Sequence, residues 1–94
     1  MAIMVKFVGA LRHASGVDQL SLDYEKNASV KKIISEIAEE HPELKRSLID
    51  QQLQDPRLNA LILLNGREIS ALDGLKTKLK DGDELVLIPV VHGG

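Results

Sequence analysis

The chain has 94 residues, of which 44% are hydrophobic and 28% are charged, and its formal net charge is −2. This length predicts a single domain. The mixed charge argues against nucleic-acid binding, which needs a basic face, and Phe7 and Tyr24 are the only aromatic residues on which bases could stack. The absence of cysteine excludes disulfides, thiolate metal sites and cysteine catalysis.

The sequence shows no targeting signal. No stretch approaches the ~20 apolar residues that a membrane span needs. Residues 1–6 lack the charged start and the long apolar run of a signal peptide. We therefore expect a cytoplasmic protein with no membrane partner.

The first part of the chain predicts two strands. Residues 3–8 are rich in β-branched and aromatic side chains, and residues 19–24 alternate between apolar and polar positions. Residues 9–18 contain two glycines and several polar side chains, and we expect them to form a long loop. Together the three segments indicate a hairpin with a long connection.

Two helices are predicted to follow. Ser29 is a suitable N-cap, and His41-Pro42 marks the end of the first helix because the residue before proline disfavours helical geometry. The apolar stripe of this helix consists of Val30, Ile33, Ile34, Ile37 and Ala38. A second, short helix is predicted over residues 43–53, with Leu44, Leu48 and Ile49 as its apolar side.

The remaining segments predict three more strands. They are residues 59–64, the short segment 67–69 and residues 84–89. Asn65-Gly66 between the first two is a strong hairpin signal, because both turn positions favour positive φ. Between the last two strands we expect a loop or single helical turn over residues 71–79 and a tight turn over residues 80–83.

This order of elements predicts an α+β domain. One main helix covers one face of a mixed sheet of four or five strands. The helix lies in the crossover between the first and last strands, which are expected to be parallel neighbours, as in a β-grasp fold. We assign residues 1–89 to this domain and residues 90–94 to a flexible tail.

The sheet face opposite the helix has no predicted cover. The alternation of the strands places Lys6, Leu61, Leu63, Val86 and Ile88 on it. Four of these five residues are aliphatic, and a contiguous exposed patch of this kind usually marks a partner site. A register error of one residue in any strand would exchange the two faces.

The chain ends in Gly93-Gly94, which suggests chemistry at the terminal carboxylate. A carboxylate must be activated before a nucleophile can attack it, and glycine leaves its carbonyl carbon unobstructed. Two glycines also let the backbone pass a narrow channel. Because the chain lacks cysteine, the terminus is the natural place for covalently carried sulfur, as a thiocarboxylate. Alternatively, the two glycines belong to a frayed chain end or were added when the protein was produced.

Three short motifs occur at a characteristic spacing: residues 7–12 with Gly16, residues 64–67, and residues 80–89 with the terminal Gly94. Together they resemble the molybdopterin-synthase small-subunit and thiamine sulfur-carrier (MoaD/ThiS) families. Residues 80–89 with Gly94 are similar to the end of those proteins. Residues 64–67 are similar to their third-strand turn, and residues 7–12 with Gly16 to the start of the molybdopterin branch. The resemblance spans nearly the whole chain.

The resemblance implies a ubiquitin-like β-grasp fold and a sulfur carrier that is not itself an enzyme. An ATP-dependent activating enzyme would adenylate the carboxylate of Gly94, which then becomes a thiocarboxylate. In the molybdopterin branch, the tail enters the large synthase subunit and donates sulfur to the pterin precursor. The residues of the tail that would contact these partners are Pro89, Val91, His92 and Gly93. No cofactor is expected to stay bound, since ATP serves the activating partner.

Some residues depart from the molybdopterin branch. The ending Val91-His92-Gly93-Gly94 looks more like ubiquitin-related modifiers used in transfer-RNA thiolation and protein conjugation. A protein modifier joined through Gly94 to lysine therefore stays open, as does a plain interaction module with incidental glycines. Arg12 is a candidate for holding an acidic group of a partner. The three histidines lie far apart in sequence, so no metal site is predicted.

Overall fold

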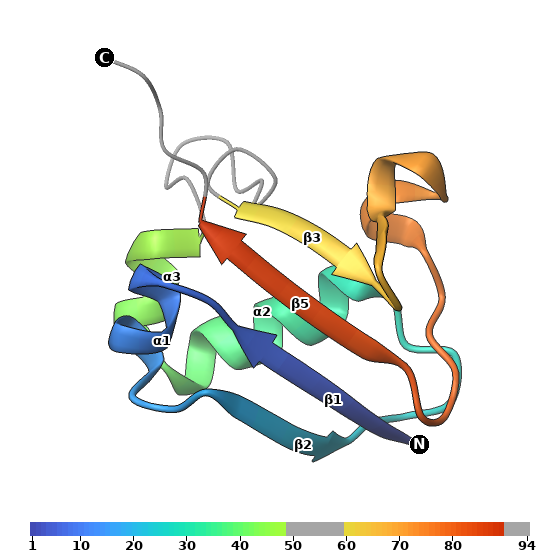
Figure 1. Cartoon of the computed structure of the whole chain (residues 1–94). Coiled ribbons are helices and arrows are strands. Elements are labelled where there is room, and N and C mark those ends of the chain that lie inside the picture. Colours follow the sequence, from blue (N-terminus) through green and yellow to red (C-terminus); the bar gives the residue numbers. More distant parts are fainter. Residues whose placement is uncertain (49–59, 90–94) are drawn as a thin grey trace.

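Five strands form one mixed sheet in the computed structural model, which describes residues 1–48 and 60–89 (Figure 1). The strands are β1 (Ala2–Phe7), β2 (Gln19–Asp23), β3 (Ala60–Leu64), β4 (Arg67–Glu68) and β5 (Glu84–Pro89). Their order across the sheet is β2-β1-β5-β3-β4. The helices are α1 (Ala10–Ser15), α2 (Val30–Glu40) and α3 (Pro42–Leu48), with 3-10 turns η2 (Ile69–Ala71) and η3 (Gly74–Lys76).

The parallel pair β1 and β5 forms the centre of the sheet. Val5 lies opposite Leu85, and Phe7 lies opposite Leu87. All four side chains are buried. Every other neighbouring pair of strands in the sheet is antiparallel. The expected α+β fold with parallel first and last strands is therefore confirmed.

Helix α2 covers one face of this sheet. It begins as predicted, because the Ser29 hydroxyl oxygen accepts a hydrogen bond from the backbone N–H of Lys32 at 3.2 Å. It ends at Glu40, and the backbone N–H of His41 still donates to the carbonyl of Ile37. The whole predicted stripe is buried: Val30, Ile33, Ile34, Ile37 and Ala38. This stripe packs on the inner face of the sheet and forms the core with it.

The prediction of a loop over residues 9–18 was wrong. Gly9 turns the chain at φ +60°, and α1 follows, with Leu11 buried in the core. One buried leucine in a six-residue helix leaves no helical periodicity in the sequence. The hairpin itself is confirmed, since β1 and β2 are antiparallel.

Smaller differences concern the ends of elements. The second helix begins at Pro42, because proline is well accommodated in a first helical turn, where its missing N–H costs nothing. Leu44 is buried, as predicted, whereas residues 49–53 of the predicted helix lie outside the described residues. The predicted strand over residues 67–69 ends at Glu68, and the segment that follows contains two 3-10 turns rather than one.

The Asn65-Gly66 hairpin is confirmed, with φ of 50° and 84° at its two positions. The Asn65 side chain also ties this hairpin to the turn before β5. Its amide nitrogen donates to Asp83 Oδ1 at 2.9 Å, and its Oδ1 accepts from the backbone N–H of Glu84 at 2.9 Å. The predicted tight turn is likewise present, since the N–H of Asp83 donates to the carbonyl of Lys80.

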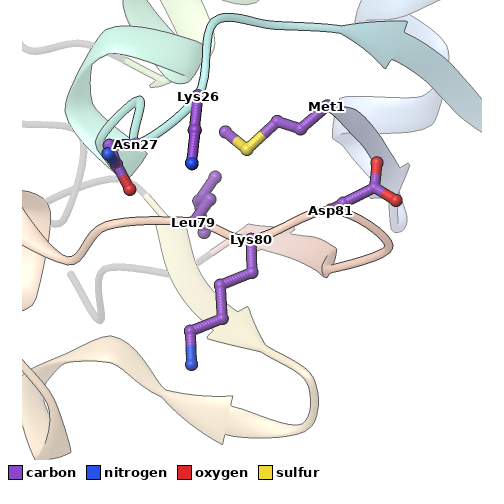
Figure 2. A pocket seen from close by; sticks show the side chains of 6 residues that line it. All are labelled: Met1, Lys26, Asn27, Leu79, Lys80 and Asp81. Carbon is purple, nitrogen blue, oxygen red and sulfur yellow. The ribbon is translucent and has the colours of Figure 1, made fainter.

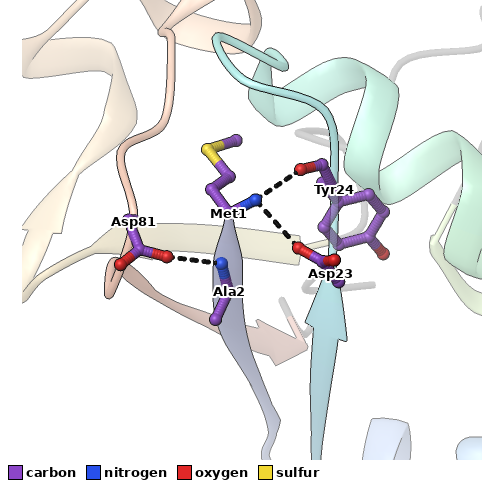
Figure 3. Close-up of polar contacts among 5 residues, drawn as sticks. All are labelled: Met1, Ala2, Asp23, Tyr24 and Asp81. Carbon is purple, nitrogen blue, oxygen red and sulfur yellow. Dashed lines mark hydrogen bonds and ion pairs between the residues drawn. The ribbon is translucent and has the colours of Figure 1, made fainter.

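The end of the sheet where β5 begins carries a second set of polar contacts. Met1 lies beside a pocket of about 340 Å³ that Lys80 and Asp81 also line (Figure 2). The α-ammonium of Met1 donates to Asp23 Oδ1 at 2.8 Å, and the Ala2 N–H donates to Asp81 Oδ1 at 2.7 Å (Figure 3). The hydrogen bond and charge of the ammonium lower the pKa of Asp23. These contacts connect β1 with β2 on one side and with the turn of β5 on the other.

Substitution of the N-cap tests the local basis of α2. We expect Ser29→Ala to lower the free energy of unfolding by about 1 kcal/mol, because the Lys32 N–H loses its acceptor. Urea denaturation followed by circular dichroism measures this. Ser35→Ala, on the exposed side of the same helix, is the matched control and should not destabilise the protein. Equal losses for both variants would contradict the assigned cap.

Candidate functional site

Strand β5 leads the chain from the centre of the sheet toward its C-terminal residues (Figure 1). Pro89 is the last residue of the strand and is partly buried opposite Ala60. The predicted tail residues Val91, His92, Gly93 and Gly94 lie outside the described residues. The structure therefore fixes the point from which the tail starts, and the roles of the four residues stay predictions.

Gly9 and Pro89 define the surroundings of that point. The Val8 N–H donates to the carbonyl of Leu87 at 3.1 Å, which extends the pairing of β1 and β5 by one bond. Gly9 comes next, and a Cβ built on it would lie 3.4 Å from Pro89 Cγ. Its φ of 60° and ψ of −130° are accessible to glycine and strained for other residues. Glycine thus allows α1 to begin directly beside the end of β5.

The face of the sheet opposite α2 carries the predicted surface residues. Along β1, β3 and β5 the buried positions alternate with more exposed ones, and the exposed set contains Lys6, Leu61, Leu63, Val86 and Ile88. We call these five residues the open-face patch. Their predicted placement on one face is confirmed, and no register error occurred. Their part in partner binding stays a prediction.

Strand pairing makes the open-face patch contiguous. Leu61 lies opposite Ile88, and Leu63 lies opposite Val86. Val86 also lies opposite Lys6 across the parallel pair. Leu61 is 38% exposed, which is high for a leucine in a β-strand. The four aliphatic side chains therefore form one apolar area with Lys6 beside it.

Two further residues lie on this face and were not included in the predicted patch. Met4 and Glu84 lie opposite each other in the parallel pair, and both share the alternation of the patch. The Lys6 ammonium lies 3.2 Å from Glu84 Oε2, and both side chains stay more than one third exposed. This exposed ion pair contributes little to the free energy of unfolding. It does give the patch a polar rim. The period of two could have revealed both residues.

Arg12 is separate from the open-face patch. It lies in α1, where its Nε is 3.0 Å from Asp18 Oδ1, and both side chains are well exposed. His13 and Gly16 line a groove of about 290 Å³ with this ion pair. A partner's acidic group would have to compete with Asp18 for Arg12.

The part of the chain that the structure describes offers neither a metal site nor a membrane-spanning helix. Residues 1–48 and 60–89 contain no group of three or more His, Asp or Glu residues arranged to hold a metal ion. Within the same ranges, no helix is both long enough and apolar enough to cross a membrane.

A mixed β-grasp sheet with one main helix and a parallel central pair defines a ubiquitin-like protein. The sequence model of the ThiS family matches residues 5–94, so the chain belongs to the ThiS family. The sequence resemblance described above is thereby confirmed at the level of the family.

Similar proteins and solved structures are consistent with this family assignment. The chain is 31% identical over 94 residues to small archaeal modifier protein 3 of Haloferax volcanii, and the match covers all of both chains. The solution structure of small archaeal modifier protein 1 from Methanosarcina acetivorans is 32% identical, with a TM-score of 0.85. That match covers 99% of this chain and 96% of the other.

A further solved structure belongs to the molybdopterin branch by its description. It is a putative molybdopterin converting factor, subunit 1, from Pyrococcus furiosus, 27% identical with a TM-score of 0.78, and the match covers 97% of this chain and 99% of that one. These relatives are small ubiquitin-like carriers and modifiers, not catalytic enzymes, in agreement with the prediction.

Two glycine substitutions test how the start of the tail is built. Gly9→Ala should lower the free energy of unfolding by about 2 kcal/mol, because its backbone conformation is strained for alanine. The added methyl group must also fit against Pro89.

Gly16→Ala is the matched control, since its φ of 77° is strained but a Cβ there meets nothing within 4 Å. We expect a smaller loss for it, about 1 kcal/mol. Chemical denaturation of both variants gives the comparison. Equal losses would contradict a backbone conformation at Gly9 that is more strained for alanine than the conformation at Gly16.

Proposed function

We propose that this protein carries sulfur on the carboxylate of Gly94. The observation that carries the proposal is the position of β5, which leads the chain past the open-face patch and ends at Pro89, five residues before Gly94. Five residues extend at most about 18 Å. A partner that covers the patch could therefore hold the terminal carboxylate in its own active site.

The chemistry proposed for Gly94 has two steps. Its carboxylate oxygen attacks the α-phosphorus of ATP, which gives an acyl-adenylate and releases pyrophosphate. A sulfur nucleophile then attacks the acyl carbon and displaces AMP. Hydrosulfide gives the thiocarboxylate directly. The terminal sulfur of a donor persulfide gives an acyl disulfide, and a second thiol then attacks the donor's sulfur, forms a disulfide with the donor and releases the thiocarboxylate. An activating enzyme would bind the ATP, so this chain needs no bound cofactor. Membership of the ThiS family supports this sequence of events.

The proposed sulfur acceptor is the pterin precursor of the molybdenum or tungsten cofactor. The partner at that stage would be the large subunit of molybdopterin synthase. Support comes from the motifs of residues 80–89 and from the likeness to the putative molybdopterin converting factor subunit. The location proposed for both reactions is the cytoplasm.

A second candidate function is protein modification through Gly94, or sulfur transfer to transfer RNA. The full-length likeness to a small archaeal modifier protein favours the modifier, as does the ending His92-Gly93-Gly94. In conjugation, a lysine amine would displace AMP and form an isopeptide bond. Tryptic cleavage after Lys80 would leave residues 81–94 attached to the modified lysine, and mass spectrometric detection of this remnant on other proteins of the source cell would distinguish this function.

Deletion of Gly94 tests the site of activation. With ATP and an activating enzyme from the same source, the intact chain should release pyrophosphate stoichiometrically, and the chain without Gly94 should release none. The deleted residue lies beyond the last strand, so the circular dichroism spectrum and unfolding midpoint should not change. Undiminished pyrophosphate release by the shortened chain would overturn the proposal.

A charge on the open-face patch tests the proposed docking. Val86→Asp should weaken binding to the activating enzyme by about tenfold or more, since a carboxylate would be buried at the centre of an apolar contact. Ser35→Asp on the exposed side of α2 adds the same charge away from the patch and should leave binding unchanged. Isothermal titration calorimetry compares them. If Val86→Asp binds as well as the unaltered chain, the patch is not the contact surface.

A further inference from the structure

The end of the molecule where β5 begins, opposite the end where β5 stops at Pro89, has a groove rimmed by cations. Arg67, Lys78 and Lys80 line this groove of about 250 Å³, and all three residues are exposed. Leu64 and Thr77, which are buried, and the half-buried Leu72 also line it. β5 spans about 17 Å between this end and Pro89. The groove therefore belongs to a different surface from the start of the tail.

Within residues 1–48 and 60–89, none of the three cations forms an ion pair. Among the described residues, Asp83 is the only acidic one that lines the groove. Its Oδ1 accepts from the Asn65 amide, and its Oδ2 accepts from the Lys80 N–H at 2.7 Å. Asp83 is thus occupied with holding the turn, and its single charge leaves a net positive charge at the groove.

The neighbouring carboxylates are also engaged elsewhere. Glu68 Oε2 accepts hydrogen bonds from the N–H and hydroxyl of Ser70. Glu84 pairs with Lys6 on the open face, and Asp81 accepts from Ala2. Like charges around one concavity repel one another, and a bound anion relieves that repulsion. The fold keeps the nearby acids away from the groove and leaves its cations available.

The direction of the Lys80 side chain assigns it to this groove. Its backbone end also lies beside the pocket that Met1 and Lys26 line, but Figure 2 shows the side chain extending away from both residues. Arg67 comes from β4 and Lys78 from the segment after η3, so three separate parts of the chain contribute to the groove.

We propose that this groove is a binding site for a compact, multiply charged anion of the phosphate class. The guanidinium of Arg67 offers two parallel donors that match phosphate oxygens, and the lysines add charge. No aromatic side chain lines the groove for a base to stack on, and it occupies only one end of the molecule, so a nucleic-acid strand does not fit it. The phosphate group can come from a free anion such as pyrophosphate or from a nucleotide.

Titration of the ¹⁵N-labelled chain with pyrophosphate at low salt tests this site. We expect saturable shifts of backbone amides around Arg67 and in the segment from Lys78 to Asp83. Arg67→Gln/Lys80→Gln should bind pyrophosphate about tenfold more weakly, since it removes two charge-assisted contacts. Lys32→Gln/Lys45→Gln removes the same charge from α2 and α3, where both lysines pair with glutamates, and should stay within about twofold.

Two further ligands distinguish the source of the phosphate. If ATP binds as tightly as pyrophosphate, the site takes phosphates carried by a nucleotide, and if only pyrophosphate binds, it takes the free anion. The proposal is overturned if no saturable shift occurs at the groove. It is also overturned if the two double variants weaken binding equally, or if citrate binds as well as pyrophosphate. Activation of Gly94 plays no part in this titration, so its result is independent of the proposed function.

Discussion

The parallel pairing of β1 with β5 is the constraint on which the rest of the structure depends. It places two strands from distant parts of the sequence side by side in the middle of the sheet, with Val5, Phe7, Leu85 and Leu87 buried beneath α2. A parallel pair requires a long crossover, and the crossover here contains α2 and the three remaining strands, β2, β3 and β4. The helix, the order of the strands and the direction of β5 all follow from this arrangement.

The same pairing separates the two ends of the molecule. At one end, β5 stops at Pro89 beside Gly9, and the terminal residues proposed to carry the chemistry follow. At the other end, the turn before β5 is fixed by Asp83 and Asn65 and holds Lys80 at the rim of the basic groove. The open-face patch lies between them. One strand thus connects three surfaces with different chemistry: an apolar face, a cationic groove and the start of the tail.

Much of the fold could be predicted because its signals are local and periodic. The stripe of α2, the alternation of β5 and the Asn65-Gly66 turn each reflect the geometry of a single element. Helix α1 could not, since six residues with one buried leucine show no period. The start of the second helix at Pro42 was missed because proline both ends one helix and can begin the next.

Only part of the candidate site could be predicted from the sequence. Alternation placed the open-face patch correctly, and the same rule would have added Met4 and Glu84. The pair of Arg12 with Asp18 depends on α1 and so stayed hidden. The groove of Arg67, Lys78 and Lys80 has no sequence motif, because folding alone brings those residues around one concavity.

The central claim is that Gly94 carries sulfur, and alkylation with a thiol-specific reagent tests it most directly. The chain would be incubated with ATP, a sulfur donor and an activating enzyme from the same source, then alkylated and measured by intact mass. Because the chain contains no cysteine, an adduct must lie on a newly formed group. The account predicts one adduct, which fragmentation places at the carboxyl end of Gly94. An adenylate that forms without any alkylated product would contradict the sulfur carrier and favour the modifier.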